Sequence, residues 1–434
     1  MEQFSAYTIV IAGSLIIIAS FFFNIIAKRT GIPSVLMLIL LGIILKQVMK
    51  SLGLPDADFF PILELLGRVG LIMIVLEAAL DLELKKEKWP IIWKSFLVAV
   101  LSLGICSILI AYVIQLFFNG DLFTSMLYAI PLSIMSSAII IPSVSILDEH
   151  RREFMIYEST FSDILGIMLF YFMLGSVEAE TSAQLTWKIV GNIFITLLIS
   201  IVVSYLLVVV FQKLKSGVKL FLLIAVLLAL YSTGKLLHLS SLVIIMTFGL
   251  VMQNRNLFFR GFLKKYVDTA AMDDIYKNFK LVTLESSFVV RTFFFVIFGM
   301  SILLSSFLNL KVIMISGIIL GILFGIRLLL MIVFVRKDIF TQVFIAPRGL
   351  ITILLFFSIP PEFQFNDFRP GILLFVILVS SGLMAWSMIR YKRLKKINEE
   401  IDRDFPDLVQ AETTAISTEN NDVESNIKEN GNEN

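Results

Sequence analysis

The chain has 434 residues, of which 58% are hydrophobic and only 16% are charged, and its mean hydropathy is +0.92. Because soluble domains carry about a quarter charged residues, this composition excludes an ordinary soluble protein and predicts an all-α membrane protein. The single cysteine, Cys106, excludes an intrachain disulfide and a cysteine-based metal cluster. The net charge of +2 is less informative than its distribution along the chain.

Apolar segments long enough to cross a bilayer recur along most of the sequence. A helix needs about 20 apolar residues to span the hydrocarbon core, and this template matches about thirteen segments. The first apolar run, Tyr7 to Ala27, lacks the basic start and small-residue cleavage site of a signal peptide, so we interpret it as a membrane helix. The predicted segments are 5–27, 33–49, 61–80, 91–117, 122–147, 153–176, 186–211, 218–236, 240–253, 279–305, 311–335, 340–358 and 371–391.

The loops between these segments alternate in charge. Basic loops such as Lys28-Arg29, Arg151-Arg152 and Arg336-Lys337 alternate with loops that are acidic or nearly uncharged, such as the one containing Glu178 and Glu180. By the positive-inside rule, this pattern predicts a multi-pass protein of the plasma or inner membrane with its N-terminus outside and its C-terminus cytoplasmic.

The composition changes near the C-terminus. We expect residues 1–397 to form the transmembrane domain, which is embedded in the lipid bilayer. Residues 398–434 are acidic, rich in Asn, Glu, Ser and Thr, and poor in large apolar residues, so they predict a disordered cytosolic tail. The tail has no Gly-rich nucleotide fingerprint, and we expect no nucleic-acid partner.

A weak internal repeat relates the two halves of the domain. The segment that begins at Gly31-Ile32-Pro33 has a glycine near its end, and so does the segment that begins at His238. The two helices are seven apart, an odd number, so they run in opposite directions. Inverted repeats of this kind build the central sites of many secondary transporters, although chance similarity between two apolar helices is the alternative interpretation.

Asp163 is the most informative polar residue, because it lies near the middle of segment 153–176. A carboxylate at this depth costs about 2.5–3.5 kcal/mol, and such residues usually line an ion or proton path. Ser159 lies four residues earlier and shares a helix face with Asp163, whereas Glu158 lies about 140° away around the helix. Carboxylate and hydroxyl oxygens are suitable ligands for a small hard cation.

Two predicted helices contain breaks. Pro131 and Pro142 lie in segment 122–147 together with Ser136 and Ser137, and Ala346-Pro347-Arg348-Gly349 interrupts segment 340–358. Proline removes a backbone donor and disturbs the preceding turn. Irregular backbone at membrane depth is tolerated where it lines a cavity, so two broken helices in inverted halves indicate a transport site.

Three arginines inside predicted helices need anionic partners or free carbonyls. Arg291 could pair with Asp163 in one state and release it to the cation in another, or it could be a static partner for Glu285, six residues before it. The sequence does not decide between these alternatives. We expect Arg348 to neutralise helix ends or carbonyls at the break. The third arginine, Arg327, also lies inside a predicted helix. All three arginines are expected to have partners, because unpaired buried charges are much more costly than paired ones.

The sequence Glu158-Ser159-x-x-Ser162-Asp163 resembles the Glu-Ser-x-x-Asn-Asp motif of the monovalent cation:proton antiporters, in particular the sodium/proton exchangers of the first type. Arg327 and Arg348-Gly349 are similar to arginine positions of that type. Two stretches, Phe293 to Met300 and Ser136 to Ile139, resemble the second type, which includes potassium-efflux antiporters. The resemblance covers roughly residues 5–391.

Two departures from the family pattern leave the ion preference open. Ser162 stands where the family has Asn, Asp or Gln, and the Thr-Asp-Pro motif of the first type is missing near Ser136 and Ser137. The titratable carboxylate of Asp163 is retained.

The resemblance implies a fold with an inverted repeat and two broken crossing helices, a moving core of six helices, and a homodimer. It implies a salt bridge between Glu158 and Arg327. From the residues themselves we expect the cation and the proton to compete for one site, and we expect Arg291 and Arg348 to compensate charge there. The residues that this interpretation assigns to cation and proton binding are Asp163, Ser159, Ser162, Ser136 and Ser137, with Na⁺ or K⁺ held on Asp163.

The most consistent hypothesis is therefore a secondary transporter, not an enzyme, that needs no cofactor besides the transported Na⁺ or K⁺ and H⁺. If Glu158 stays paired, only Asp163 titrates, and the exchange is one-for-one and electroneutral. A cation channel and a non-transporting membrane sensor on the same fold remain alternatives. A bile-acid-type sodium symporter shares the broken helices but not the expected pairing of Glu158 with Arg327.

Overall fold

The structure is a computed structural model of the whole chain. It describes residues 6–30, 32–53, 60–175, 198–210, 219–236, 241–259, 269–301, 309–336, 339–365 and 367–404. Within these residues the regular structure is entirely helical. Seven helices are long and apolar enough to cross a membrane, and three shorter apolar helices are Leu198–Val210, Leu220–Gly234 and Leu242–Gln253. Each predicted segment contains helix, which confirms the all-α membrane architecture.

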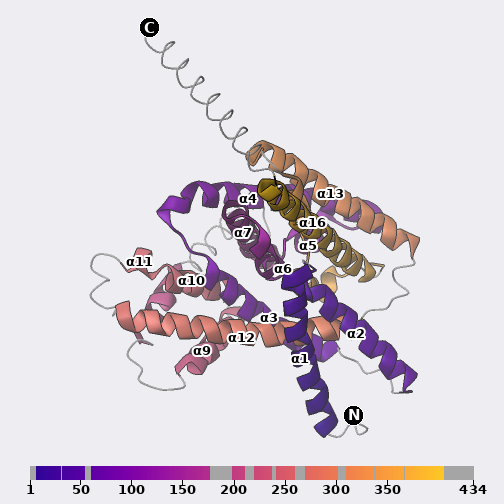
Figure 1. The fold of residues 1–434 in the computed structure, drawn as a ribbon. Helices are drawn as coiled ribbons and strands as arrows, with labels where there is room; N and C mark the ends of the chain where they lie inside the picture. The colour runs from indigo at the N-terminus through magenta and orange to yellow at the C-terminus, as the bar shows by residue number, and fades with distance from the viewer. Residues whose placement is uncertain are drawn as a thin grey trace.

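Besides the helical residues 198–210, ten helices of thirteen or more residues form most of the described bundle (Figure 1). They are α1 (Ala6–Thr30), α2 (Ser34–Ser51), α3 (Phe60–Asp81), α4 (Trp89–Phe118), α7 (Glu149–Gly175), α9 (Lys219–Leu236), α10 (Ser241–Gln253), α12 (Thr269–Ser301), α13 (Leu310–Phe334) and α16 (Gly371–Asp404). The shorter elements are α5 (Leu122–Ser133), α6 (Ser137–Ser143), α11 (Arg255–Phe258), α14 (Ile339–Phe344), α15 (Leu350–Phe357) and the 3₁₀ turns η1 (Lys86–Lys88), η2 (Val144–Ile146) and η5 (Pro361–Phe363).

Some sequence predictions fall outside the described residues. These are residues 186–197 and 211 of segment 186–211, the loop with Glu178 and Glu180, and His238. The helix α16 continues to Asp404, so the first residues of the predicted tail are helical. Residues 405–434 are not described, and their predicted disorder stays a prediction.

The helices pack in two groups that meet at the broken helices (Figure 1). One group contains α1, α2, α3, α9, α10 and α12, with α12 packed along both α2 and α3. The other contains α4, α5, α6, α7, α13, α14 and α16. The short helix α15 contacts α3 on one side and α5 and α7 on the other, so it lies where the two groups meet.

Small residues permit a very close approach of α2 and α12. A Cβ atom added to Gly42 would overlap the carbonyl oxygen of Val296, and a Cβ atom added to Gly299 would overlap the carbonyl oxygen of Ile39. Small residues at such contacts let membrane helices gain van der Waals packing, because apolar side chains alone give no preference for protein over lipid.

Both predicted helix breaks are present and they touch. The first break separates α5 from α6 at residues 134–136, and the second separates α14 from α15 at residues 345–349. The amide of Ser136 donates a hydrogen bond of 2.9 Å to the carbonyl of Pro347, which joins the two breaks directly. Pro347 disfavours a helical conformation at Ala346, which explains why α14 ends just before it. The two broken crossing helices predicted from the sequence are thus confirmed.

The glycine contact generates a stability prediction. We expect Gly299→Ala to destabilise the protein by about 1–3 kcal/mol, because the added methyl group would push α12 away from α2. The matched control is Gly317→Ala on α13, where a Cβ atom meets nothing within 4 Å. This control should keep or slightly raise the melting temperature. The measurement is thermal unfolding in detergent, and equal melting temperatures for the two variants would contradict the role of close packing.

Candidate ion-binding site

Asp163 lies on α7 beside the break between α5 and α6 and is 2% exposed. Its Oδ2 atom accepts a hydrogen bond of 3.1 Å from the amide of Ser137, the first residue of α6. Its Oδ1 atom is buried and has no hydrogen-bond partner among the described residues. One carboxylate oxygen therefore holds the broken helix, and the other is available to a ligand.

The serine side chains near Asp163 differ in their hydrogen-bond partners. Ser162 accepts a hydrogen bond of 3.0 Å from the amide of Met135, inside the break, so its hydroxyl compensates a backbone donor that the interrupted helix leaves free. Ser159 donates to the carbonyl of Ile156 at 3.1 Å. Ser136 is buried, and its hydroxyl has no partner among the described residues.

The described part of the chain contains no group of three or more His, Cys, Asp or Glu side chains that could hold a metal ion. Among the described residues, Oδ1 of Asp163 and Oγ of Ser136 are two buried oxygens at the first break that have no hydrogen-bond partner. A site of this kind carries one negative charge and weak neutral ligands. It fits a monovalent cation or a proton better than a divalent metal, which prefers several oxygen ligands with more charge.

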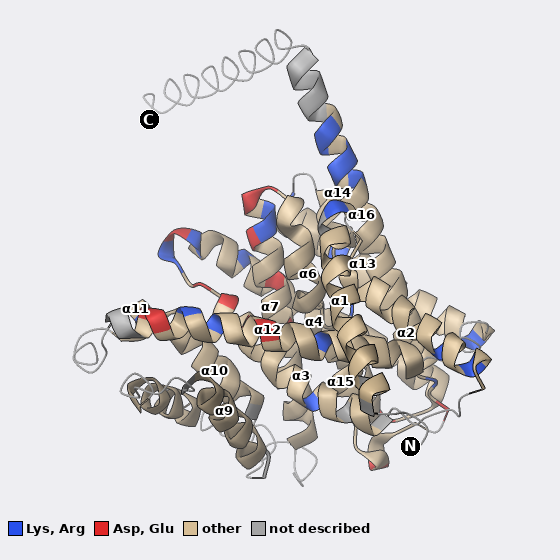
Figure 2. Ribbon diagram, turned by 60° about the horizontal axis from the view of Figure 1, so that its bottom comes forward, with Lys and Arg blue, Asp and Glu red and all other residues tan. Residues whose placement is uncertain are grey.

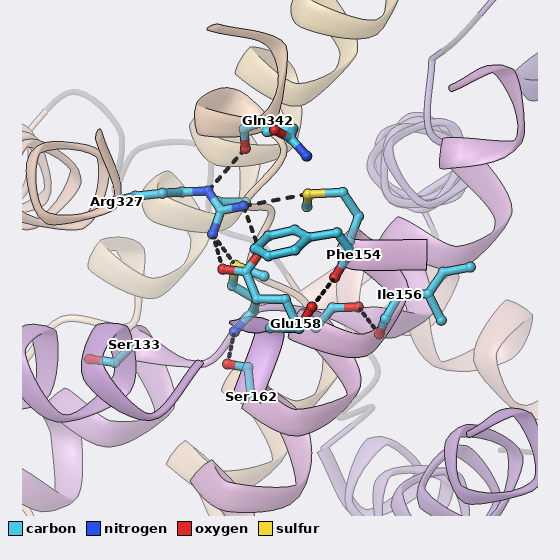
Figure 3. A network of polar contacts seen from close by, with 12 residues as sticks. Ser133, Phe154, Ile156, Glu158, Ser162, Arg327 and Gln342 are labelled. Carbon is cyan, nitrogen blue, oxygen red and sulfur yellow. Dashed lines mark hydrogen bonds and ion pairs between the residues drawn. The ribbon is translucent and has the colours of Figure 1, made fainter. Parts of the chain in front are cut away.

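Glu158 forms a buried ion pair with Arg327 on α13 (Figure 3). The two guanidinium nitrogens Nη1 and Nη2 lie 2.5 and 3.0 Å from the two carboxylate oxygens. The Nε atom donates to the carbonyl of Gln342 on α14 at 3.0 Å. Glu158 and Arg327 are 0% and 1% exposed, so the pair joins α7, α13 and α14 in the interior.

Arg348 satisfies carbonyl groups on both sides of the crossover. Its guanidinium donates to the carbonyls of Leu132 and Ser133 at the end of α5, at 3.0 and 3.3 Å, and to that of Ala346 at 2.6 Å. The last carbonyls of a helix have no partner within it and carry partial negative charge. A buried cation placed among them replaces the missing donors.

Arg291 has a different carboxylate partner from the two that the sequence suggested. Its Nη2 atom lies 3.5 Å from Oε1 of Glu77 on α3, and its Nη1 atom lies 3.4 Å from the carbonyl oxygen of Ala138 on α6. Glu285 is exposed on another face of α12. Among the described residues, the carboxylate that Arg291 contacts in this structure is therefore that of Glu77, and not that of Asp163 or Glu285.

Sequence reasoning missed Glu77. The available signal was its position near one end of an apolar segment, 61–80, where an ionisable residue is a candidate for function. Its partner could not be found from spacing, because Glu77 and Arg291 are 214 residues apart.

The fold of the chain is similar to that of solved sodium proton antiporters. The chain is similar to MjNhaP1 from Methanocaldococcus jannaschii at pH 8, with 19% identity, a TM-score of 0.65 and coverage of 88% of this chain and 95% of that one. It is also similar to an electron-microscopy structure of the same antiporter, with 18% identity, a TM-score of 0.62 and coverage of 90% and 96%.

A family model described as the transmembrane region of sodium/hydrogen exchangers matches residues 16–388. The chain belongs to this family, which consists of secondary transporters and not of enzymes. A search of curated proteins finds no match. The resemblance noted in the sequence is thereby confirmed at the level of the family.

The buried ion pair generates a second prediction. Glu158→Gln should destabilise the protein by about 3–5 kcal/mol, because it leaves the charge of Arg327 buried without a counter-charge. Arg327→Gln should have a similar effect. The neutral double variant Glu158→Gln/Arg327→Gln should regain part of the loss, because no uncompensated charge remains. Melting temperature and the monodisperse fraction in detergent are the measurements. Single variants as stable as the unmodified protein would show that the pair does not brace the interior.

Proposed function

We propose that this protein exchanges a monovalent cation, Na⁺ or K⁺, for H⁺, and that Asp163 binds the two in turn. The observation that carries the proposal is that the two oxygens of Asp163 differ in their hydrogen bonding. Oδ2 accepts a hydrogen bond from the amide of Ser137, while Oδ1 is buried and has no partner among the described residues. A protonated carboxyl and a cation-bound carboxylate are both neutral forms of this group, whereas the bare carboxylate is costly to move through the membrane.

The neighbouring charges support one titrating group. Glu158 is compensated by Arg327, and Glu77 lies against Arg291. Arginine does not release its proton in proteins. Asp163 is therefore the carboxylate of this region without an ion-pair partner among the described residues. Competition of one cation and one proton for one carboxylate leads to electroneutral exchange.

The identity of the cation is proposed from family membership. The family model names sodium, and the similar solved structures are described as sodium proton antiporters, which favours Na⁺. The sequence features shared with potassium-efflux antiporters keep K⁺ as an alternative substrate. Ser162 bonds a backbone amide, so we propose that it acts by shaping the break near the cation.

We further propose a homodimer in the cell membrane with a cytoplasmic C-terminus. The support for this orientation is the basic end of α16, where several Lys and Arg residues lie on the part of the helix that leaves the bundle (Figure 2). Basic residues are retained on the cytoplasmic side of membrane proteins. Labelling of single cysteines from each side of the membrane tests the orientation, and native mass spectrometry tests the dimer.

The central proposal is tested with Asp163→Asn in proteoliposomes. We expect the variant to lose proton flux driven by a pulse of Na⁺ or K⁺, because asparagine carries no exchangeable charge, while the melting temperature stays close to that of the unmodified protein. The matched control is Asp148→Asn, which changes an exposed aspartate outside α7. Persistent cation-driven proton flux in Asp163→Asn would overturn the proposal.

The stoichiometry is tested by running Na⁺, K⁺ and Li⁺ gradients in parallel with and without an imposed membrane voltage. Electroneutral exchange should carry no net current, and its rate should not change with voltage. A current that reverses with voltage would contradict one-for-one exchange. Cation flux without any coupled proton movement would indicate a channel.

A further inference from the structure

A second polar region lies between α3 and α12, away from the oxygens of Asp163. The two helices run antiparallel, and their register follows from three contacts. Asp81 forms an ion pair of 2.6 Å with Lys280, a Cβ atom added to Gly70 would lie 3.2 Å from Val290, and one added to Gly67 would lie 3.6 Å from the ring of Phe294. Residue numbers on α12 thus fall as those on α3 rise. This register brings residues 283–284 of α12 level with Glu77.

Three polar oxygens in this part of the interface have no partner among the described residues. They are Oε2 of Glu77, Oγ1 of Thr283 and Oγ of Ser287. Thr283 and Ser287 are both 0% exposed, and they lie four residues apart on the face of α12 that carries Lys280 and Val290. Buried polar atoms in native proteins find a partner in the protein or in ordered water.

The charges of this region favour water over a cation. Oε1 of Glu77 faces the guanidinium of Arg291, so the negative charge of the carboxylate is already compensated. What remains is one carboxylate oxygen and two hydroxyls. A buried water typically needs two to four polar partners of this kind. A bound cation would instead add an uncompensated positive charge next to Arg291.

Arg291 connects this region with the broken helix. Pro142 has no amide hydrogen, so the carbonyl of Ala138, four residues earlier in α6, lacks its usual helical donor. Arg291 supplies that donor through Nη1 at 3.4 Å. Ala138 directly follows Ser137, whose amide holds Oδ2 of Asp163. The carbonyl that Arg291 contacts and the amide that donates to Asp163 are thus separated by only one peptide unit.

We propose that Glu77, Thr283 and Ser287 enclose an ordered water between α3 and α12, and that this hydrated site positions Arg291 to hold α6. Arg291 is then a positioning residue for Asp163, acting through the backbone of α6. The contacts of Arg291 are 3.4 and 3.5 Å long, at the weak end of the hydrogen-bond range. The consequence for ion binding rests on the proposed exchange function, whereas the consequence for α6 does not.

The structural part is tested by hydrogen exchange of α6 amides in nanodiscs. Arg291→Gln and Glu77→Gln should each speed the exchange of peptides covering residues 134–143, because the start of α6 loses its support. Thr283→Val should act in the same direction, because the isosteric change removes a partner of the water. The matched control, Lys280→Gln, breaks an ion pair of the same two helices that lies away from α6, and it should leave these peptides unchanged. Unchanged exchange in Arg291→Gln, or equal acceleration in Lys280→Gln, would overturn the proposal.

The functional part is tested by transport kinetics on the same variants. Arg291→Gln should raise the apparent KM for the cation roughly 10-fold with a smaller change in maximal rate, as outer-shell supports of ion ligands do. Arg291→Lys should recover part of the loss, and Glu77→Gln/Arg291→Gln should be no worse than the poorer single variant. An unchanged KM with a lost maximal rate would contradict positioning. If the unmodified protein shows no exchange, the proposed function fails, while hydrogen exchange still decides the role of Arg291.

Discussion

Two helices that stop inside the membrane leave backbone amides and carbonyls without helical partners, and no bulk water is present there to replace them. The polar side chains at the crossover supply the missing partners. Asp163 and Ser162 accept from amides on the α6 side of the first break, and Arg348 donates to carbonyls at the ends of α5 and near α14. The site is therefore built from the same groups that make the broken helices possible.

This constraint separates the two carboxylates of α7. Both carboxylate oxygens of Glu158 accept hydrogen bonds from Arg327, and the resulting pair joins α7 to α13 and α14. One carboxylate oxygen of Asp163 accepts a hydrogen bond from an amide, and the other has no partner among the described residues. A neutral amide stabilises a carboxylate less than an arginine does. The two carboxylates, five positions apart on one helix, are thus stabilised by different kinds of partner.

The interface of α3 and α12 extends the same reasoning beyond the crossover. Proline in α6 frees the carbonyl of Ala138, and Arg291 reaches it from the other group of helices. Glu77 compensates the charge of Arg291. Arg291 thus connects the two helix groups at a carbonyl that is one peptide unit away from the amide that donates to Asp163.

Much of this protein was determined by local sequence. Apolar length set the membrane segments. Pro347 lies within the second break, and Pro131 and Pro142 lie inside α5 and α6, on either side of the first. Helical rotation alone separated Glu158 from Asp163. The partners of the arginines were decided only by tertiary structure. The pairing of Arg291 with Glu77 spans 214 residues and depends on the register of two antiparallel helices, which no local pattern encodes.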